Sequence, residues 1–246
     1  AWGYHGGNSE LVVGRALAAH PRDSFYLATK FPSYDVSNFG KHQQIFEKQL
    51  EKCQVEYFDY YLLHNICETN IEQYMAEDTY HTVAYFQEQK AQGRIKHLGF
   101  SVHGNFDVFK RFMDKFGDIM EFCQVELNYF DWSFQDAKAK VEYLNERNIP
   151  IVVMEPLRGG HLVNVPDKVR GTFASVDADR SPIEWAFDFL WDKPQISLLL
   201  SGMGTPAQID ENVAMAERAH VGMLSQEEQA VYETVATVFN LSLIHI

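Results

Sequence analysis

The chain has 246 residues, of which 46% are hydrophobic and 14% aromatic, which is enough apolar surface for a substantial core. Its formal net charge of -13 argues against a nucleic-acid-binding or membrane-surface protein, so any anionic ligand must be held by local groups. No apolar run approaches the roughly 20 residues of a membrane span. The 3 cysteines form no CxxC pair and indicate neither a disulfide framework nor a metal site. We therefore expect a cytoplasmic protein with ordinary buried thiols.

The two ends of the sequence raise separate expectations. The chain begins at Ala1, without a methionine and already inside a dense motif, so we expect the natural N-terminus to lie upstream. Residues 241–246 are apolar and carry no helix stop signal. We predict one domain over residues 1–240 and a non-native or disordered tail over residues 241–246.

Short β-rich apolar runs alternate with segments of helical period, which predicts successive βα units and a parallel sheet. The expected strands cover residues 25–31, 58–63, 97–102, 122–127, 151–154 and 196–200. The expected helices cover residues 9–19, 43–53, 83–92, 106–116, 134–148, 182–191 and 206–218. Capping boxes that begin at Ser181, Thr205 and Ser225 mark three helix starts.

The number and order of these units indicate the fold. Consecutive strand–helix units without internal repeats are typical of an eightfold barrel. The alternative is an open Rossmann-type sheet, but that fold needs a glycine-rich turn after its first strand, and no GxGxxG occurs. We therefore predict an α/β fold, an incomplete (β/α)8 TIM barrel that lacks its first strand and most of its second.

Barrel enzymes carry their reactive groups where strands end. Here the apolar runs are closed or followed by polar residues, namely Tyr4, Lys30, His64, Ser101, His103, Glu126, Asn128, Glu155 and Ser201. Taken singly, each has a structural explanation, since a lone histidine after a strand is more often structural than catalytic. The combination of an acid, a cation and an imidazole, in Tyr4, Lys30 and His64, favours one catalytic group.

Motifs along nearly the whole chain resemble one known family. In order, they are GYHGGNSELVVGRAL, ATKFP, YFDYYLLHN, GRIKHLGFS, QVELNYFD, PLRGG and SGMGTPAQIDEN. The ordered set resembles the aldo-keto reductase family of bacterial type. The resemblance implies NAD(P)H-dependent reduction of small-molecule aldehydes or ketones, with the family's catalytic Tyr, Lys and His at Tyr4, Lys30 and His64. The family's catalytic Asp would lie before Ala1, which leaves Lys30 without the residue that normally positions it.

The chemistry explains why these three residue types are needed together. Hydride arriving at a carbonyl carbon leaves charge on the oxygen, which must be stabilised and protonated. Tyr4 is the candidate acid, and the ammonium of Lys30 would lower a phenol pKa that is ordinarily about 10. His64 would hold the carbonyl oxygen and share in proton relay, which requires a second hydrogen-bond partner for its ring.

The same resemblance implies a cofactor site. Ser101 and Gln124 match positions that bind the nicotinamide amide, and Met154 stands where an aromatic residue often stacks on the ring. The remaining positions are Leu157 and Gly159 in the expected pyrophosphate loop, Gly202, Met203 and Gln208 around the last phosphate-binding helix start, and Glu211 and Asn212 at the adenine. Basic residues that often hold the 2′-phosphate align with Gly202 and Gln208, which weakens the family expectation of NADPH over NADH.

Substrate and partners are less constrained. Trp2, His5 and Trp132 are expected at the barrel mouth and favour an aromatic or apolar carbonyl compound, although rim aromatics serve equally often in packing. We expect no nucleic-acid or membrane partner. One subgroup of similar proteins continues into a ferredoxin-like module, so iron–sulfur clusters are expected only in a longer parent protein.

Two other functions are kept as alternatives. His64, Glu126 and Glu155 offer nitrogen and oxygen ligands for a divalent-metal barrel enzyme, but this leaves Tyr4 and Lys30 without roles. A nucleotide-binding regulatory barrel without turnover is the stronger alternative, because some relatives of the family are regulatory subunits.

Overall fold

The computed structural model describes residues 2–134 and 136–243, and the chain divides into two compact units, Ala1–Gln124 and Val125–Ile246. The strands are hydrogen-bonded in chain order from β1 to β6, and β4 (Cys123–Glu126) crosses the division between the units. This is the order of consecutive strands in a (β/α)8 barrel of which six are present. In the described part of the chain, no helix is long and apolar enough to cross a membrane.

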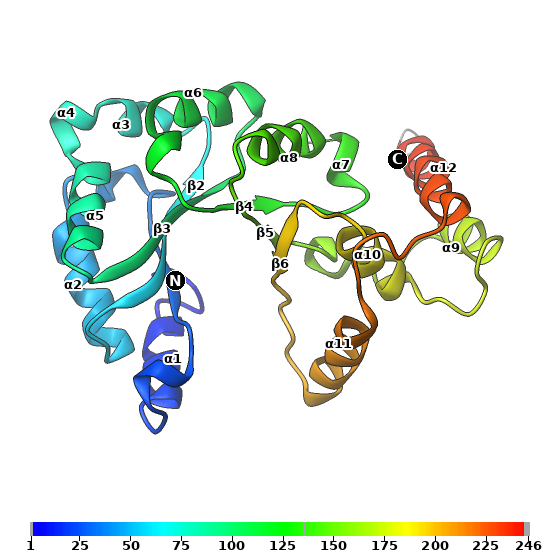
Figure 1. Ribbon diagram of the computed structural model, residues 1–246, viewed down its shortest axis with the longest axis horizontal. Coiled ribbons are helices and arrows are strands. Elements are labelled where there is room, and N and C mark those ends of the chain that lie inside the picture. Colours follow the sequence, from blue (N-terminus) through cyan, green and yellow to red (C-terminus); the bar gives the residue numbers. More distant parts are fainter. Residues whose placement is uncertain (1, 135, 244–246) are drawn as a thin grey trace. The chain divides into compact units, whose positions relative to one another are not determined.

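The first unit is built on three parallel strands, β1 (Ala28–Phe31), β2 (Phe58–Ile66) and β3 (Ile95–Val102). Lys30 is opposite Leu62 in the register of β1 and β2. Helix α2 packs against β1 and α5 against β3 (Figure 1). The helices of this unit are α1 (Ser9–Leu17), α2 (His42–Cys53), α3 (Ile71–Met75), α4 (Glu77–Tyr80), α5 (Thr82–Ala91) and α6 (Phe106–Phe116).

The second unit contains the parallel strands β5 (Ile151–Met154) and β6 (Ile196–Leu199). Its core includes the stacked rings of Phe173 and Trp185, whose centroids are 4.8 Å apart. Its helices are α7 (Asp131–Phe134), α8 (Ala137–Glu146), α9 (Asp167–Ala174), α10 (Pro182–Trp191), α11 (Pro206–Arg218) and α12 (Gln226–Leu243) (Figure 1). The predicted tail thus begins inside α12, and residues 244–246 lie outside the described residues, so this prediction stays untested.

All six predicted strands are present; β5 has the predicted bounds, and the other five differ at one or both ends. The first begins at Ala28 instead of residue 25 because the Asp59 carboxylate accepts the N–H of Leu27 at 2.8 Å and takes it out of the ladder. The predicted helix over residues 134–148 is α8, which covers only Ala137–Glu146 and begins after Asp136, whose φ of 52° lies in the left-handed region. The short helix α7 before it was not predicted. Helices α3, α4 and α9 were not predicted, because they are short and carry little periodic signal.

The predicted capping boxes are confirmed at all three sites. At Ser181 and Thr205 the side chain accepts from the third helical N–H, and the Glu184 or Gln208 side chain bonds back to the cap. Ser225 and Glu228 make the same reciprocal pair, at 2.7 and 3.2 Å. These boundaries were predictable because each depends on residues three positions apart.

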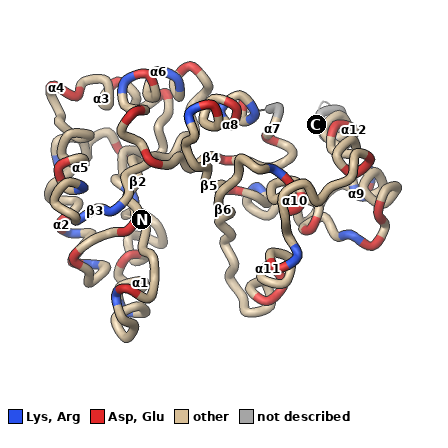
Figure 2. Tube along the Cα trace, in the orientation of Figure 1, with Lys and Arg blue, Asp and Glu red and all other residues tan. Residues whose placement is uncertain are grey.

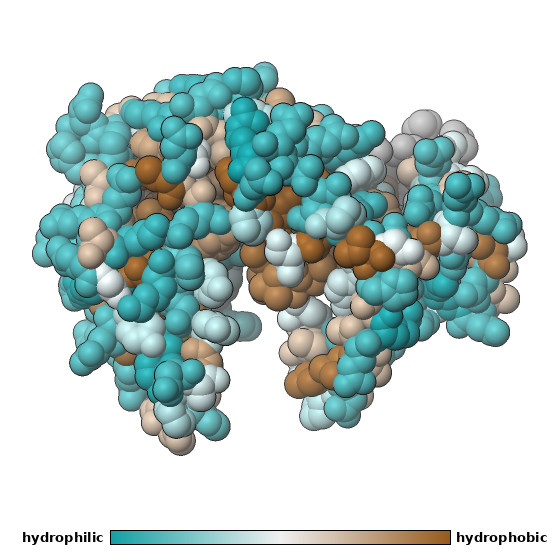
Figure 3. Space-filling view, in the orientation of Figure 1, coloured by the Kyte–Doolittle hydropathy of each residue, from teal (hydrophilic) through white to brown (hydrophobic). Residues whose placement is uncertain are grey.

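Acidic and basic side chains are interspersed along the helices (Figure 2). Much of the surface viewed in Figure 3 is hydrophilic, with hydrophobic surface over α11. The apolar side chains exposed on β6, on α11 and in the loop between them are Leu198, Leu200, Met203, Ile209 and Val213. The predicted buried state of the thiols holds for Cys53 and Cys123, while Cys67 is partly exposed.

Helices α1 and α2 approach each other closely at Gly14. A methyl group on Gly14 would lie 2.4 Å from the Lys52 carbonyl oxygen and 2.9 Å from the Cys53 Cα. Both are backbone atoms, so the helices must separate to admit it. We expect Gly14→Ala to lower the free energy of unfolding by about 2 kcal/mol, measured by urea denaturation.

Gly171 in α9 gives the matched control. A methyl group there would meet no atom within 4 Å, so Gly171→Ala should be neutral or stabilise the protein by about 0.5–1 kcal/mol through helix propensity. An unfolding free energy that is unchanged in Gly14→Ala would show that the two helices are not held at this distance.

Candidate active site

Tyr4 and His64 are in direct contact. The Tyr4 Oη and the His64 Nε2 are 3.3 Å apart, within hydrogen-bonding distance, and the two rings meet edge to face with centroids 5.9 Å apart. His64 lies near the end of β2 and is 7% exposed, whereas Tyr4 is 48% exposed. A phenol that is open on one side and bonded to a buried imidazole on the other can meet a small molecule from solvent.

The backbone before α1 presents Tyr4 in this orientation. His5, Gly6 and Gly7 have φ values of 52°, 63° and 84°, three consecutive residues in the left-handed region. Glycine adopts this region without the steric cost that a Cβ incurs. The Tyr4 carbonyl oxygen accepts from the N–H of Gly7 at 3.1 Å and of Ser9 at 3.3 Å, which closes the turn onto the start of the helix.

Lys30 projects from β1 into a poorly solvated environment. Burial lowers the pKa of its ammonium from 10.5 to about 8, because desolvation disfavours the charged form. Among the described residues, no carboxylate forms an ion pair with the Lys30 Nζ. A lysine whose pKa is close to neutral can gain or lose its proton at little cost.

The surroundings keep His64 neutral. Burial, and then the positive charge of Lys30, lower the pKa of His64 from 6.5 to about 3. Its Nδ1 is buried and has no hydrogen-bond partner among the described residues, so the second ring partner expected from the sequence is not found there. Lys30 and His64 are therefore electrostatically coupled, and His64 is suited to hydrogen bonding more than to proton release.

The two residues of the first unit that are predicted to bind the nicotinamide are buried within strands. Ser101 closes β3 with 0% exposure, and its Oγ accepts the N–H of Asn65 at 2.9 Å. Its hydroxyl proton is left for another acceptor. Gln124 on β4 is 4% exposed. Both predicted residues thus occupy a sheet position that leaves little freedom to their side chains.

In the second unit, the loop after β5 fits an anionic group. Arg158, Gly159 and Gly160 have φ values of 49°, 61° and 91°, and a methyl group on Gly160 would meet no atom within 4 Å. Successive N–H groups in such turns can point into one concavity and bind anions. Met154 ends β5 and Leu157 directly precedes the turn, and their cofactor roles stay predictions.

The Arg158 side chain is held by residues that the sequence did not single out as a group. Its Nε donates to Asp131 Oδ2 at 3.2 Å, its guanidinium lies 4.3 Å from the centre of the Phe130 ring, and Asn128 donates to the same Asp131 oxygen at 2.7 Å. Burial raises the pKa of Asp131. No local pattern connects Arg158 with Asp131, 27 positions away, so this cluster was not predictable from the sequence.

The loop before α11 is open, and its predicted residues have distinct positions. Gly202 would admit a side chain, since nothing lies within 4 Å of a Cβ built there, and Met203 is 39% exposed. Gln208 Oε1 accepts from the N–H of Gly204 at 2.8 Å, so its side chain caps the helix. Asn212 donates to Ser201 Oγ at 2.9 Å, and Glu211 is exposed.

Of the predicted substrate residues, Trp2 and His5 belong to the first unit and Trp132 to the second. The Trp2 ring lies under the Lys52 Nζ at 4.4 Å, and His5 is exposed in the turn beside Tyr4. Trp132 on α7 packs on Phe189, with ring centroids 5.7 Å apart. The Tyr34 ring meets the His64 ring edge to face, with centroids 5.5 Å apart. Tyr34 is therefore a further candidate for substrate contact.

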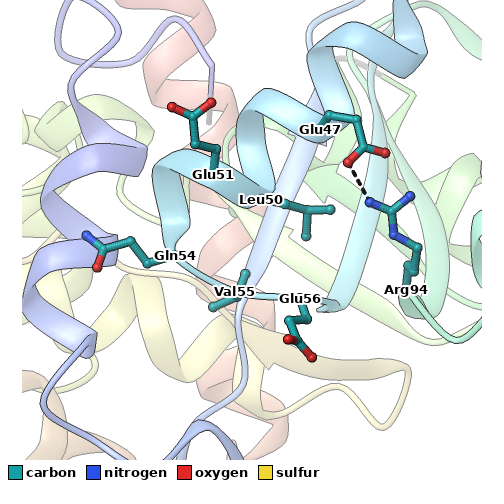
Figure 4. A pocket seen from close by; sticks show the side chains of 7 residues that line it. All are labelled: Glu47, Leu50, Glu51, Gln54, Val55, Glu56 and Arg94. Carbon is teal, nitrogen blue, oxygen red and sulfur yellow. Dashed lines mark hydrogen bonds and ion pairs between the residues drawn. The ribbon is translucent and has the colours of Figure 1, made fainter.

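A surface hollow at the end of α2 is separate from these residues (Figure 4). Glu47 and Arg94 form an ion pair across it at 2.7 Å. None of the predicted site residues lines it; its residues are Glu47, Leu50, Glu51, Gln54, Val55, Glu56 and Arg94. Within the described ranges, no group of three or more His, Cys, Asp or Glu side chains is placed to hold a metal ion.

Comparisons with known proteins agree with the predicted fold. The chain matches an aldo-keto reductase from Bacillus halodurans with a TM-score of 0.75 at 21% identity, over 92% of this chain and 78% of that one. It matches an aldo/keto reductase from Klebsiella pneumoniae in complex with NADP and acetate with a TM-score of 0.71 at 18% identity, over 95% and 77% of the chains. The predicted incomplete barrel is confirmed.

Sequence comparison extends this agreement. L-galactose dehydrogenase of Arabidopsis thaliana is 26% identical over 98% of this chain and 82% of its own length. The family model described as Aldo/keto reductase family matches residues 1–230. The resemblance seen in the motifs is therefore confirmed, and with it the class of NAD(P)H-dependent oxidoreductases. The chain belongs to the aldo-keto reductase family.

Proposed function

We propose that the protein reduces aldehydes or ketones with a nicotinamide cofactor, with Tyr4 as proton donor and Lys30 and His64 assisting. The observation that carries this proposal is the contact of the Tyr4 Oη with His64 Nε2 at 3.3 Å, beside a lysine with a pKa of about 8. The reduced nicotinamide, when bound, supplies the hydride. Every other step falls to side chains of this chain.

The proposed roles follow from the charge states. His64 is neutral at physiological pH because its pKa is about 3, so its Nε2–H can donate to the carbonyl oxygen without releasing a proton. Tyr4 then gives its proton to the oxygen as negative charge develops there. Lys30 stabilises the resulting phenolate electrostatically. The phenol is reprotonated from solvent, which its 48% exposure permits.

The residues of the second unit fit a dinucleotide. Residues 158–160 offer the left-handed turn for the pyrophosphate, and Thr205 opens an α-helix of 13 residues whose N-terminus favours an anion. No lysine or arginine occurs between Lys193 and Arg218, so no basic side chain of that stretch can hold a 2′-phosphate. We therefore propose that NADH is accepted at least as well as NADPH.

The preference between NADPH and NADH should shift toward NADPH when a positively charged side chain replaces Gly202, where a side chain meets no other atom within 4 Å. Gly202→Arg leaves the Gln208 cap intact and should tighten NADPH binding about 10-fold relative to NADH. Gly171→Arg adds the same charge to α9, where a side chain is also tolerated, and should leave the ratio of dissociation constants unchanged. If the ratio of the NADPH and NADH dissociation constants is unchanged in Gly202→Arg, the 2′ position of the bound cofactor's ribose does not lie near residue 202.

The substrate is proposed from the side chains around Tyr4. Trp2 and Tyr34 favour an aromatic or apolar carbonyl compound. The relationship to L-galactose dehydrogenase adds sugar oxidation as a second candidate reaction, through the same residues in reverse. A cytoplasmic location remains a prediction.

The test of the proposed function is a turnover assay combined with a binding measurement. The full-length protein is incubated with NADH or NADPH and a panel of aromatic, aliphatic and sugar aldehydes and ketones, and with L-galactose and NAD in the other direction. Carbonyl-dependent loss of the reduced cofactor is expected. Tight nucleotide binding without turnover on any compound would instead favour the regulatory barrel.

A further inference from the structure

A buried carboxylate lies behind the catalytic group. Glu10, in the first turn of α1, is 2% exposed and lies six residues after Tyr4 in the sequence. Its Oε1 accepts from Thr29 Oγ1 at 2.8 Å and from Gln49 Nε2 at 2.9 Å. Burying a carboxylate is costly unless hydrogen bonds satisfy it, and here these two donors satisfy Oε1.

Gln49 connects this carboxylate to the strand that carries the catalytic lysine. Its side chain is fully buried, and its Nε2 also donates to the carbonyl oxygen of Lys30 at 2.9 Å. Its Oε1 accepts from Tyr61 Oη at 2.6 Å, which fixes the orientation of the amide. The position of the Lys30 backbone is therefore linked to the position of Glu10.

Lys52 connects the same carboxylate to the segment that carries Tyr4. Its Nζ lies 3.5 Å from Glu10 Oε2 and donates to the Gly7 carbonyl oxygen at 3.2 Å. It also lies 4.4 Å from the centre of the Trp2 ring. One cation thus contacts the chain on both sides of Tyr4, and it is only 13% exposed.

We propose that Glu10, Gln49 and Lys52 form a positioning network that sets Tyr4 and Lys30 relative to each other. The proposal rests on the proposed function, because it assigns the network's effect to those two residues. Besides Thr29 and Tyr61, the three side chains contact the Lys30 and Gly7 carbonyl oxygens and the Trp2 ring. They therefore act through the turn before α1 and the end of β1. Displacements of about 1 Å at reacting groups can cost about 10²-fold in rate.

Substitutions in a network that only stabilises the fold would have different effects. They would lower the melting temperature and leave the rate of the properly folded enzyme unchanged. A positioning network lowers kcat while KM and nucleotide affinity change little, because binding contacts remain. Comparing the fall in kcat with the fall in melting temperature of each variant separates the two roles.

The main variant is Gln49→Met, which keeps the length of the side chain and removes its hydrogen bonds. We expect kcat to fall about 10- to 100-fold, with the nucleotide dissociation constant within about 2-fold of the native value. Tyr61→Phe removes a single hydroxyl from the same network and serves where Gln49→Met fails to fold. Its kcat should fall about 3- to 10-fold by the same reasoning.

Tyr232→Phe is the matched control. Tyr232 is likewise buried, at 6% exposure, and its Oη donates to the Trp185 carbonyl oxygen at 2.8 Å in the second unit. Its removal deletes one buried hydroxyl bond without touching the network. We expect a drop in melting temperature similar to that of Tyr61→Phe, with kcat unchanged.

A spectroscopic signature completes the test without requiring turnover. The ¹⁵N resonances of the His64 ring report its bond to Tyr4, and they should shift in Gln49→Met and Tyr61→Phe but not in Tyr232→Phe. Unchanged kcat and unchanged His64 resonances in both network variants would overturn the proposal. If Tyr4→Phe keeps full turnover, the proposed function fails instead, and the two failures are thereby distinguished.

Discussion

Replacing Tyr4 with phenylalanine is expected to lower kcat for carbonyl reduction by about 10²- to 10⁴-fold, the range in which a positioned general acid contributes. The substitution removes one oxygen atom and keeps the ring, which meets His64 edge to face at 5.9 Å. Because the residues proposed for the phosphates lie in the other unit, nucleotide affinity should change less than about 3-fold. Steady-state kinetics and nucleotide titration measure the two effects.

Tyr26→Phe provides the control for this prediction. Tyr26 belongs to the same unit, is 83% exposed, and precedes β1. Removing its hydroxyl should leave both kcat and nucleotide affinity unchanged. A Tyr4→Phe protein that turns over as fast as this control would exclude Tyr4 as the proton donor.

Lys30→Met is expected to abolish most of the activity and at the same time to stabilise the protein at neutral pH. The pKa of Lys30 is about 8 in the folded state against 10.5 ordinarily, so folding buries a charge at a cost of about 3 kcal/mol. Methionine fills a similar volume without that cost. The loss of the cation should lower kcat at least about 10²-fold, because the phenolate loses its electrostatic partner.

The sign of the pH dependence makes this prediction specific. Between pH 8 and 10.5 the unfolded chain binds the Lys30 proton and the folded protein does not, so native stability should rise with pH through this window. Below pH 8 both states are charged and the folded state bears the full cost. Lys30→Met should lack the rise, so its advantage at pH 7 should vanish near pH 10.5.

Urea denaturation of both proteins at pH 7, 9 and 10.5 measures these differences. A native protein whose stability runs parallel to that of Lys30→Met across the whole range would show that Lys30 is well solvated.

The fold was largely predictable because its signals are local. The apolar runs and the three capping boxes depend on residues a few positions apart, and the strands and helix starts they predicted are present. The predicted ends of elements were wrong where a residue distant in sequence, or the local backbone conformation, determines them. Asp59 on β2 shortens β1, and the left-handed Asp136 delays the start of the helix predicted from residue 134.

The candidate site was predictable to the same degree. The strand ends indicated Tyr4 and His64, and the structure brings them together. Gln49 carried no signal, because its bond to Glu10 joins residues 39 positions apart and a glutamine within an amphipathic helix looks like a surface residue. The cofactor role of Gln208 stays a prediction, and its capping of α11 through the amide oxygen is an additional role that the structure shows.

The most direct test of the account is the fate of a deuterium label. Reduced nicotinamide cofactor deuterated at C4 is incubated with the full-length protein and an aromatic aldehyde, and the product alcohol is analysed by mass spectrometry. With deuterium at both C4 positions of the cofactor, the product alcohol should carry one deuterium at the former carbonyl carbon, and this labelled product should form about 10²- to 10⁴-fold more slowly in Tyr4→Phe. Cofactor that binds without passing its label to any carbonyl compound would contradict it.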